Sequence, residues 1–270
     1  VIRNSCSRKN VMKFAKKLHE GILLSRYKRF FADIEYKGEK ITIHVPNTGS
    51  LKSVIDKGSQ KPQKVWFSLH GDPEKKLKGT LEAVQAVNGS WVGVNTSNPN
   101  RIVTEAIETA LQNGTTFLPQ WKGYGFYKSE YKISPETRLD GAFFANEDDF
   151  KKVKENPKAQ VKIHFIEIKN TTYLPEDQKK SVVQFPDGVS ERAQKHLIEM
   201  MGLMKQGHKC EVIFTVQRSD ATAFSPCKEM DPEYSKLFYK AVDAGLIVSP
   251  LVVDFDREQI CLTNKLLKII

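Results

Sequence analysis

The chain contains 270 residues, of which 40% are hydrophobic, 27% charged and 10% aromatic. A chain of this length and composition can bury a substantial core, which excludes intrinsically disordered, collagen-like and low-complexity proteins. No run of roughly 18 consecutive apolar residues occurs, so the sequence predicts neither a membrane-spanning helix nor a membrane partner.

The excess of positive charge lies in the first third of the chain. Residues 1–79 contain 18 basic and 7 acidic side chains, whereas residues 80–270 contain 24 basic and 25 acidic ones. Such a localised excess indicates a polyanionic partner, and we predict DNA, with RNA as an open alternative. Residues 26–44 alternate as strands do, which disfavours a basic amphipathic helix on a membrane surface. A merely well-solvated basic surface is the remaining alternative.

The cysteines and nucleotide motifs limit the cofactors. No CxxC or CxxH spacing occurs among Cys6, Cys210, Cys227 and Cys261, so neither zinc nor a disulfide framework is indicated. A reducing cytoplasm is the simplest setting. GxGxxG and P-loop motifs are absent, so we expect no nucleotide cofactor. Residues 1–11 lack the apolar segment of a secretory signal, and we expect them to be a leader or upstream extension.

Short alternating runs with turn signals predict an OB-like β-barrel over residues 12–80. The segment from Tyr36 to Glu39 is typical of a hairpin turn, and Asn88-Gly89 is a second hairpin signal. The remaining short strands are expected at 65–69, 81–87 and 90–95. A basic face with interleaved aromatics favours nucleic-acid binding by this barrel, although periodicity alone does not distinguish it from other small barrels.

The sequence pattern changes after Pro99. Residues 81–270 predict a separate α/β domain with a mixed sheet, so we expect the whole chain to be α+β or mixed in class. Helices are expected at 99–113, 189–206 and 231–244. Strands are expected around 126–133, 136–145, 161–169, 210–217 and 246–255.

The predicted strand at 161–169 carries a candidate catalytic group. Glu167 and Lys169 are separated by Ile168, so their side chains point to the same face of the strand. The residues before them form an apolar run, as expected of a strand that is covered on both faces. Placing an acid and a base at the end of such a strand costs free energy, so we expect these two residues to have a function. Asp140 lies on the preceding predicted strand, from which its carboxylate would reach Glu167.

An Asp followed on the next strand by Glu-x-Lys is the signature of PD-(D/E)XK nucleases, and we predict metal-dependent hydrolysis of a phosphodiester. Two carboxylates suit Mg²⁺ or Mn²⁺, held by Asp140, Glu167 and the Ile168 carbonyl, while Lys169 positions the attacking water. Glu105, on the preceding helix, is a candidate for a further acidic ligand. Because the spacing is common by chance, a solvated strand end is the alternative interpretation.

Beyond this core, the sequence resembles the sugar fermentation stimulation protein A (SfsA) family from about Met12 to the last strand. The resemblance is carried, in the family's order, by HVPNTGS (44–50), WVGVNT (91–96), PNRIVTEAI (99–107), RLDGAFF (138–144), IEIKNTT (166–172), FPDGVSERAQKHL (185–197), VQRSD (216–220) and DPEYSKL (231–237). It implies an OB-type barrel followed by a PD-(D/E)XK nuclease-like domain, and DNA binding. The family's genetic link to maltose and other sugar utilisation leaves a second hypothesis, a catalytically silent DNA-binding regulator of those genes.

The resemblance also assigns roles to individual residues. The family's acidic, acidic and basic positions are matched by Asp140, Glu167 and Lys169. Glu105 matches an acidic position on the helix after the VNT motif. Gln194 and Lys195 lie on the long helix where nucleases of this fold place a residue that touches the metal-bound phosphate. The charged segment from Asn146 to Gln160 departs from the family, which makes the register of the neighbouring strands less certain.

Candidate nucleic-acid contacts lie in a basic, aromatic strand and in two turns that contain Asn-Thr. They are Arg26, Tyr27, Lys28, Arg29, His44, Asn47, Thr48, Asn95 and Thr96. If residues 26–31 form one strand, only every second side chain can face nucleic acid. The turns are either ordinary strand ends or meet near the domain junction and line a groove. His164 and His196 lack a second ligand at metal spacing and are expected to be packed or solvent-facing.

Overall fold

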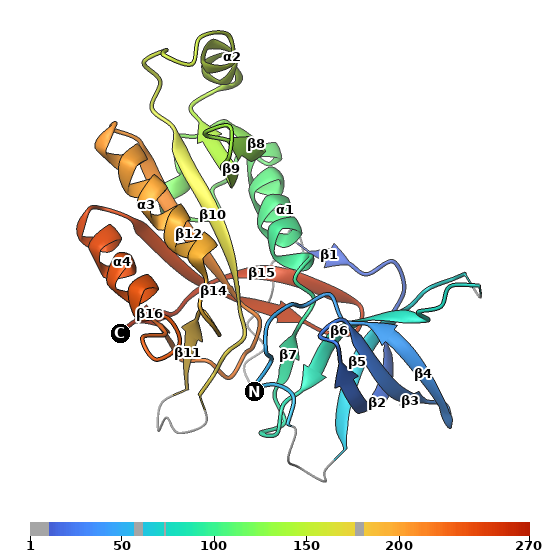
Figure 1. The fold of residues 1–270 in the computed structure, drawn as a ribbon. Helices are drawn as coiled ribbons and strands as arrows, with labels where there is room; N and C mark the ends of the chain where they lie inside the picture. The colour runs from blue at the N-terminus through green and yellow to red at the C-terminus, as the bar shows by residue number, and fades with distance from the viewer. Residues whose placement is uncertain (1–10, 57–61, 73, 176–180) are drawn as a thin grey trace.

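The computed structural model describes residues 11–56, 62–72, 74–175 and 181–270, which form a small β-barrel and a larger α/β domain (Figure 1). Of the expected leader, residues 1–11, all but Val11 lie outside the described residues. None of the helices in the described part is long and apolar enough to cross a membrane.

The barrel is built from the N-terminal third of the chain. Its sheet has the order β4-β3-β2-β5-β6-β7. The strands are β2 (His19–Tyr27), β3 (Phe31–Tyr36), β4 (Glu39–His44), β5 (Gln63–Leu69), β6 (Gly79–Gln85) and β7 (Trp91–Gly93). His44 of β4 pairs in parallel with Thr80 of β6, which closes β2 to β6 into a five-stranded barrel. Inward-facing apolar side chains such as Ile34, Ile43 and Phe67 fill it, so the expected barrel is confirmed.

Residues 26–31 are not one strand, contrary to expectation. Tyr27 ends β2 and pairs with Phe31, the first residue of β3. Lys28 and Arg29 form the hairpin turn between them, with φ of 47° and 63°. The expected alternation of faces therefore breaks at this turn, and both basic side chains are exposed at its tip.

The larger domain contains the expected mixed sheet, in the order β1-β15-β14-β12-β10-β9-β8. Its strands are β1 (Met12–Lys13), β8 (Phe126–Lys132), β9 (Arg138–Phe144), β10 (His164–Thr171), β12 (Lys209–Val216), β14 (Ile247–Phe255) and β15 (Gln259–Leu266). The central strands β10, β12 and β14 are parallel, and the others pair antiparallel. A small parallel sheet that the sequence did not predict contains β11 (Val182–Phe185), β13 (Ala223–Pro226) and β16 (Lys268–Ile269).

Helices cover both faces of this sheet (Figure 1). They are α1 (Asn98–Gln112), α2 (Glu147–Glu155), α3 (Glu191–Lys205) and α4 (Pro232–Asp243), with a short 3₁₀ helix η1 (Pro119–Trp121). The side chains of Ser190 and Asp231 cap α3 and α4 by accepting backbone N–H bonds. Ile166 and Ile168 of β10 pack on the α1 side, whereas Phe165 packs with α3. Because strand side chains alternate, Glu167 and Lys169 face α3.

The charged segment after β9 does not disturb the register of the neighbouring strands. It contains α2, which is capped by Asn146 and buries no residue. Strand β9 pairs with β10 so that Phe143 lies opposite His164 and Gly141 opposite Ile166. The segment forms an exposed helix at the end of the sheet far from the barrel (Figure 1).

The strand pairing moves the expected domain boundary. Strand β6 crosses the boundary expected after residue 80, and the barrel sheet continues to Gly93. At the other end, Met12 pairs with Ile260 of the larger sheet rather than with the barrel. The chain therefore enters the larger domain first, forms the barrel, and then returns.

The cysteines differ in part from expectation. Cys210 and Cys227 are buried and free. Cys261 is disulfide-bonded, which the scattered spacing of the cysteines did not indicate.

Candidate active site and nucleic-acid interface

The candidate active site lies where strands β9 and β10 separate. Their ladder ends at the pair Gly141 and Ile166, and the next residue of β9 is Asp140. The Ile168 backbone N–H donates to Asp140 Oδ2 at 2.7 Å. The Asp140 carboxylate thus takes the place of a main-chain acceptor, which holds it beside the Glu167–Lys169 segment as the sequence predicted.

Glu167 is the centre of a buried polar cluster. Its side chain is 3% exposed, and Lys169 Nζ donates to Glu167 Oε1 at 2.5 Å. His196 of α3 contributes Nδ1, also 2.5 Å from Oε1. Because an ionised carboxylate only accepts, Nδ1 carries the proton. Glu167 Oε2 is buried and has no hydrogen-bond partner in the described part of the chain.

The two carboxylates have opposite pKa shifts. Burial, followed by the charge of Glu167, raises the pKa of Asp140 to about 6. Burial alone would also raise the pKa of Glu167, but Lys169 and His196 together hold it below its ordinary value. At neutral pH, both carboxylates are therefore ionised in a poorly solvated site, and their repulsion is one that a bound cation would relieve.

The residues present fit a hard divalent cation. The free Glu167 Oε2 and the Asp140 carboxylate are oxygen donors, the ligands that Mg²⁺ and Mn²⁺ prefer. Within the described ranges, no group of three or more His, Cys, Asp or Glu side chains is arranged to hold a metal. Two carboxylates with main-chain and water oxygens match the few protein ligands that Mg²⁺ usually takes.

Helix α1 contributes Asn100 to the site, and the role of Glu105 stays a prediction. Asn100 Nδ2 donates to Asp140 Oδ1 at 2.7 Å. Five residues correspond to a rotation of about 140° around a helix, so Asn100 and Glu105 point in different directions. Asn100 was not expected in the site from the sequence, because its contact with Asp140 depends on how α1 packs beside β9.

On α3, the side chain that reaches the site is His196, and neither Gln194 nor Lys195 does so. Gln194 Nε2 donates to both carboxylate oxygens of Asp231, at 2.9 and 3.1 Å. Lys195 is half-exposed and forms ion pairs with Glu136 and Glu199. His196 is buried, which agrees with the packed position expected for it, but its bond to Glu167 was not expected. The available signal was a polar side chain on the buried stripe of α3.

The two turns that contain Asn-Thr meet at the domain junction, as one of the two interpretations predicted. Asn47 Nδ2 donates to the Val94 carbonyl at 2.9 Å, and Thr96 Oγ1 donates to the Pro46 carbonyl at 2.6 Å. Asn95 Nδ2 instead donates to Glu82 at 2.8 Å. Asn47 and Thr96 thus hold the turns together, while the exposed Thr48 makes no side-chain hydrogen bond to another described residue.

Arg26, on strand β2 of the barrel, supports the first of these turns. Its guanidinium donates to the carbonyls of Asn47, Gly49 and Ser50, at 2.8, 3.0 and 3.2 Å. The expected role of Arg26 as a phosphate ligand is therefore replaced by a structural one. Tyr27 likewise donates its hydroxyl to Asp33, at 3.2 Å. His44 remains in the ladder, opposite Phe31.

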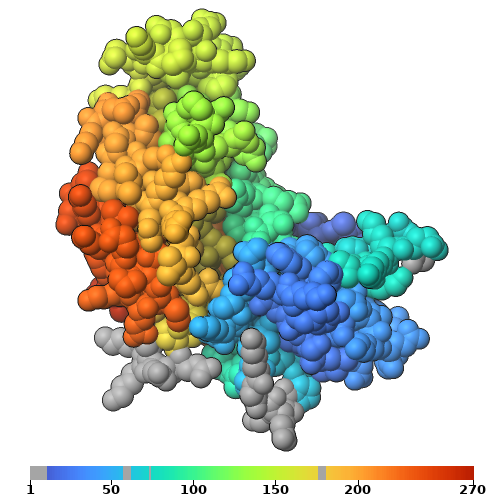
Figure 2. Space-filling model, viewed as in Figure 1, coloured from blue at the N-terminus to red at the C-terminus, as the bar shows by residue number. Residues whose placement is uncertain are grey.

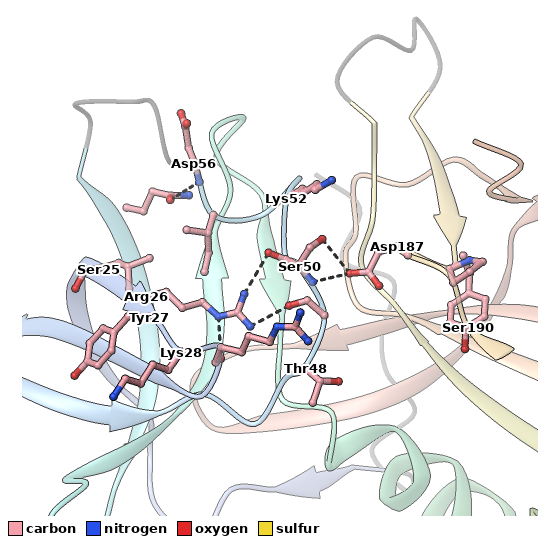
Figure 3. A pocket seen from close by; sticks show the side chains of 18 of the residues that line it. Ser25, Arg26, Tyr27, Lys28, Thr48, Ser50, Lys52, Asp56, Asp187 and Ser190 are labelled. Carbon is pink, nitrogen blue, oxygen red and sulfur yellow. Dashed lines mark hydrogen bonds between the residues drawn. The ribbon is translucent and has the colours of Figure 1, made fainter. Parts of the chain in front are cut away.

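A recess of about 1080 Å³, here called the basic recess, lies between the barrel and the larger domain. Arg26, Lys28, Arg29 and Lys52 line it on the barrel side. The segment 185–190 lines it on the other side, and Ser50 donates to Asp187 across it through N and Oγ, at 3.1 and 3.3 Å (Figure 3). Figure 2 shows the barrel, in blue, set against the flank of the larger domain, in orange and yellow.

Comparison with known proteins agrees with these two units. Residues 24–94 match the family model described as "SfsA N-terminal OB domain". Residues 97–259 match the model described as "Sugar fermentation stimulation protein RE domain". The expected OB barrel is thus borne out by both the pairing of its strands and this match.

Curated relatives extend the similarity over nearly the whole chain. The sugar fermentation stimulation protein homolog of Bdellovibrio bacteriovorus is 48% identical over 259 residues, which cover 95% of this chain and 98% of that protein. The homolog of Alcanivorax borkumensis is 37% identical over 240 residues, which cover 88% and 91%. Among solved structures, Pyrococcus furiosus SfsA in complex with Ca²⁺ has the same fold, with a TM-score of 0.73 and 20% identity over 96% of this chain and 98% of that one.

Proposed function

The chain belongs to the sugar fermentation stimulation protein family, and we propose that it binds nucleic acid at the domain junction and hydrolyses a phosphodiester bond at Asp140 and Glu167. The observation that carries this proposal is the bond from the Ile168 amide to Asp140, which sets a second carboxylate beside Glu167. The unpartnered Glu167 Oε2 leaves a ligand position available in this site.

The proposed metal ligands are Asp140, Glu167 and the Ile168 carbonyl, and the metal is Mg²⁺ or Mn²⁺. When bound, such an ion lowers the pKa of a coordinated water and polarises a phosphoryl oxygen. Ca²⁺, bound by the Pyrococcus furiosus relative, is likewise a cation that takes oxygen ligands. Asn100 orients Asp140 by its bond to Oδ1, so the carboxylate presents a defined edge to the site.

Lys169 and His196 act on the other carboxylate. Both lie at 2.5 Å from Glu167 Oε1, which fixes the side chain and directs Oε2 away from them. The Lys169 ammonium is 14% exposed and can contact an entering phosphate, where it positions the attacking water and offsets the charge that grows on phosphorus. His196 positions Glu167 and, being buried behind it, does not touch the substrate.

The proposed nucleic-acid surface is the barrel side of the basic recess. Lys28 and Arg29 are exposed at the tip of the hairpin turn, and Lys52 lines the same recess. Phosphate neutralisation by such side chains gives affinity without sequence preference and makes it fall with salt. DNA is the proposed partner, with RNA tested alongside it.

The hydrolysis is tested with labelled single- and double-stranded DNA and RNA, in Mg²⁺, Mn²⁺ or EDTA. Wild type is expected to cleave in the presence of metal, and Asp140→Ala, Glu167→Ala and Lys169→Ala are expected to lose cleavage. Binding is expected to be retained or tightened in the two carboxylate variants, because one negative charge facing phosphate is removed. Cleavage that persists in EDTA or in Asp140→Ala would show that this site is not its source.

A second candidate function is DNA binding without hydrolysis, as in a regulator of sugar utilisation genes. It is favoured by the finding that no three His, Cys, Asp or Glu side chains of the described residues are grouped so that they could hold a metal. Inertness of wild type towards all substrates and metals, together with enrichment of particular sites in a selection from random DNA, would support it over the nuclease.

A further inference from the structure

A smaller recess, here called the junction pocket, adjoins the basic recess. It encloses about 160 Å³ between the two Asn-Thr turns of the barrel and the carboxyl end of β10. The two recesses share Thr48, Gly49, Phe185 and Asp187 among their lining residues, so they lie side by side.

The pocket is lined by polar atoms that lack partners. Thr171 is 1% exposed, and its Oγ1 has no hydrogen-bond partner in the described residues. Asn170 Oδ1, next to it at the end of β10, is likewise buried and unpartnered. A buried polar atom without a partner is costly, and native proteins seldom retain one unless a ligand or water satisfies it. Both residues line the junction pocket, so a ligand there can supply the missing bonds.

The lining also indicates the charge of the ligand. Apart from Asp187, it consists of hydroxyl, amide, aromatic and glycine residues, with neither Lys nor Arg. An anionic phosphate would have no cation to meet there. A neutral group with hydroxyl or amino donors fits better, because the Asn170 carbonyl oxygen can only accept.

The position of the junction pocket relative to Lys169 indicates to which group the neutral group is attached. Lys169 and Thr171 lie two residues apart on β10, so their side chains emerge on the same face, separated by about 7 Å along the strand. A phosphate at Lys169 would therefore have its neutral neighbour at the junction pocket. Alternation of a phosphate with a neutral group bearing donors is the chemistry of a nucleotide chain.

Resting on the proposed function, we propose that the junction pocket receives an unpaired nucleoside of a single-stranded nucleic acid, next to the phosphate at Lys169. The base and sugar donors bond to Thr171 and Asn170. The phosphates on the other side run over Lys28, Arg29 and Lys52 in the basic recess. Bases in a duplex are paired and stacked, so only an unpaired nucleotide can enter a recess between two domains.

The test measures the binding of fluorescent oligodeoxynucleotides at low salt in the Asp140→Ala background, where hydrolysis does not interfere. One probe is single-stranded, one is the blunt duplex of the same sequence, and one is that duplex with an unpaired end. Thr171→Val removes the unpartnered hydroxyl while keeping the shape of the side chain. Thr48→Trp, at an exposed residue that lines both recesses, obstructs them and keeps the test valid should Thr171→Val fold poorly. Thr116→Val, an exposed threonine beyond the end of α1, is the control.

The single strand and the duplex with an unpaired end are expected to bind more tightly than the blunt duplex. Thr171→Val should weaken the binding of those two probes about two- to tenfold, the equivalent of one hydrogen bond, and leave the binding of the blunt duplex unchanged. The control variant Thr116→Val should bind all three probes as the Asp140→Ala protein does. Equal binding of all probes, or no effect of Thr171→Val and Thr48→Trp, would overturn the pocket assignment while leaving the proposed function standing. Failure of every probe to bind would overturn both.

Discussion

The backbone amide of Ile168 donates a 2.7 Å hydrogen bond to Asp140 Oδ2 across the opening between β9 and β10. The main-chain ladder of these strands has ended by this point, so a side chain completes the bonding of β10. One carboxylate oxygen thereby accepts a bond from Ile168 and the other from Asn100, and each oxygen keeps a second acceptor site. The position of Asp140 thus depends on two elements that are distant in the sequence, α1 and β10.

Replacement of Asp140 with Asn is expected to stabilise the metal-free protein above neutral pH. The pKa of this carboxyl is raised from 3.8 to about 6, so the folded state holds its proton more tightly than the unfolded state does. The stabilisation is present below the unfolded pKa and is lost as pH rises through about 6, by at most about 3 kcal/mol. Asp140→Asn should not show this loss. Urea unfolding of wild type and Asp140→Asn in EDTA, at about pH 5 and about pH 8, measures the loss of stability in each protein.

Asp148→Asn, on the exposed helix α2, is the control for general charge effects. An Asp140→Asn variant that is no more stable than wild type at the higher pH would contradict the prediction.

Asn100 and Glu105 on α1 form a matched pair of substitutions. Asn100→Ala is expected to weaken hydrolysis or divalent-ion binding about tenfold, because one bond that orients Asp140 is lost. Glu105→Gln is expected to leave both nearly unchanged, since Glu105 lies about 140° around α1 from Asn100. Isothermal titration with Mn²⁺ and cleavage assays measure the two effects. A larger loss in Glu105→Gln would reassign Glu105 as the third acidic ligand.

Removal of charge at the hairpin turn is expected to reduce the salt dependence of nucleic-acid binding. Replacing Lys28 and Arg29 with Gln should lower the log–log slope on single strands by about 1.4, because each phosphate contact contributes about 0.7. Lys154 and Lys158 are exposed residues in and just after α2, far from the barrel, and they serve as the control. The same replacement there should leave the slope unchanged. Equal slopes for both double variants and wild type would place the binding surface elsewhere.

Arg26 is expected to contribute to stability rather than to affinity. Arg26→Ala removes donors from three carbonyls of the turn at residues 47–50 and should lower the free energy of unfolding by about 2–3 kcal/mol. Arg138→Ala, in the exposed pair with Glu130, should cost no more than about 1 kcal/mol. Denaturant unfolding of both variants compares the two. A stable Arg26→Ala that has lost nucleic-acid binding would restore Arg26 as a phosphate ligand.

Local patterns determined most of the elements and the central pair of the site. The spacing of Glu167 and Lys169 placed both on one face of a strand, and Asp140 on the preceding strand was correctly expected beside them. The helices at α1, α3 and α4 followed from apolar stripes and capping residues, which depend on neighbours only a few positions away. The hairpin at Lys28 and Arg29 was missed because neither residue type is typical of left-handed turns.

Only the tertiary structure decided which polar side chains complete the site. His196 and Asn100 reach Glu167 and Asp140 because α3 and α1 pack on opposite faces of β10, at a rotation that the helix sequences do not specify. Gln194 and Lys195 had suitable chemistry but bond to other side chains. Likewise, the junction pocket exists because the barrel docks beside the end of β10 and leaves Thr171 without a partner. A local pattern specifies the face of an element, whereas a contact between elements depends on packing across the whole core.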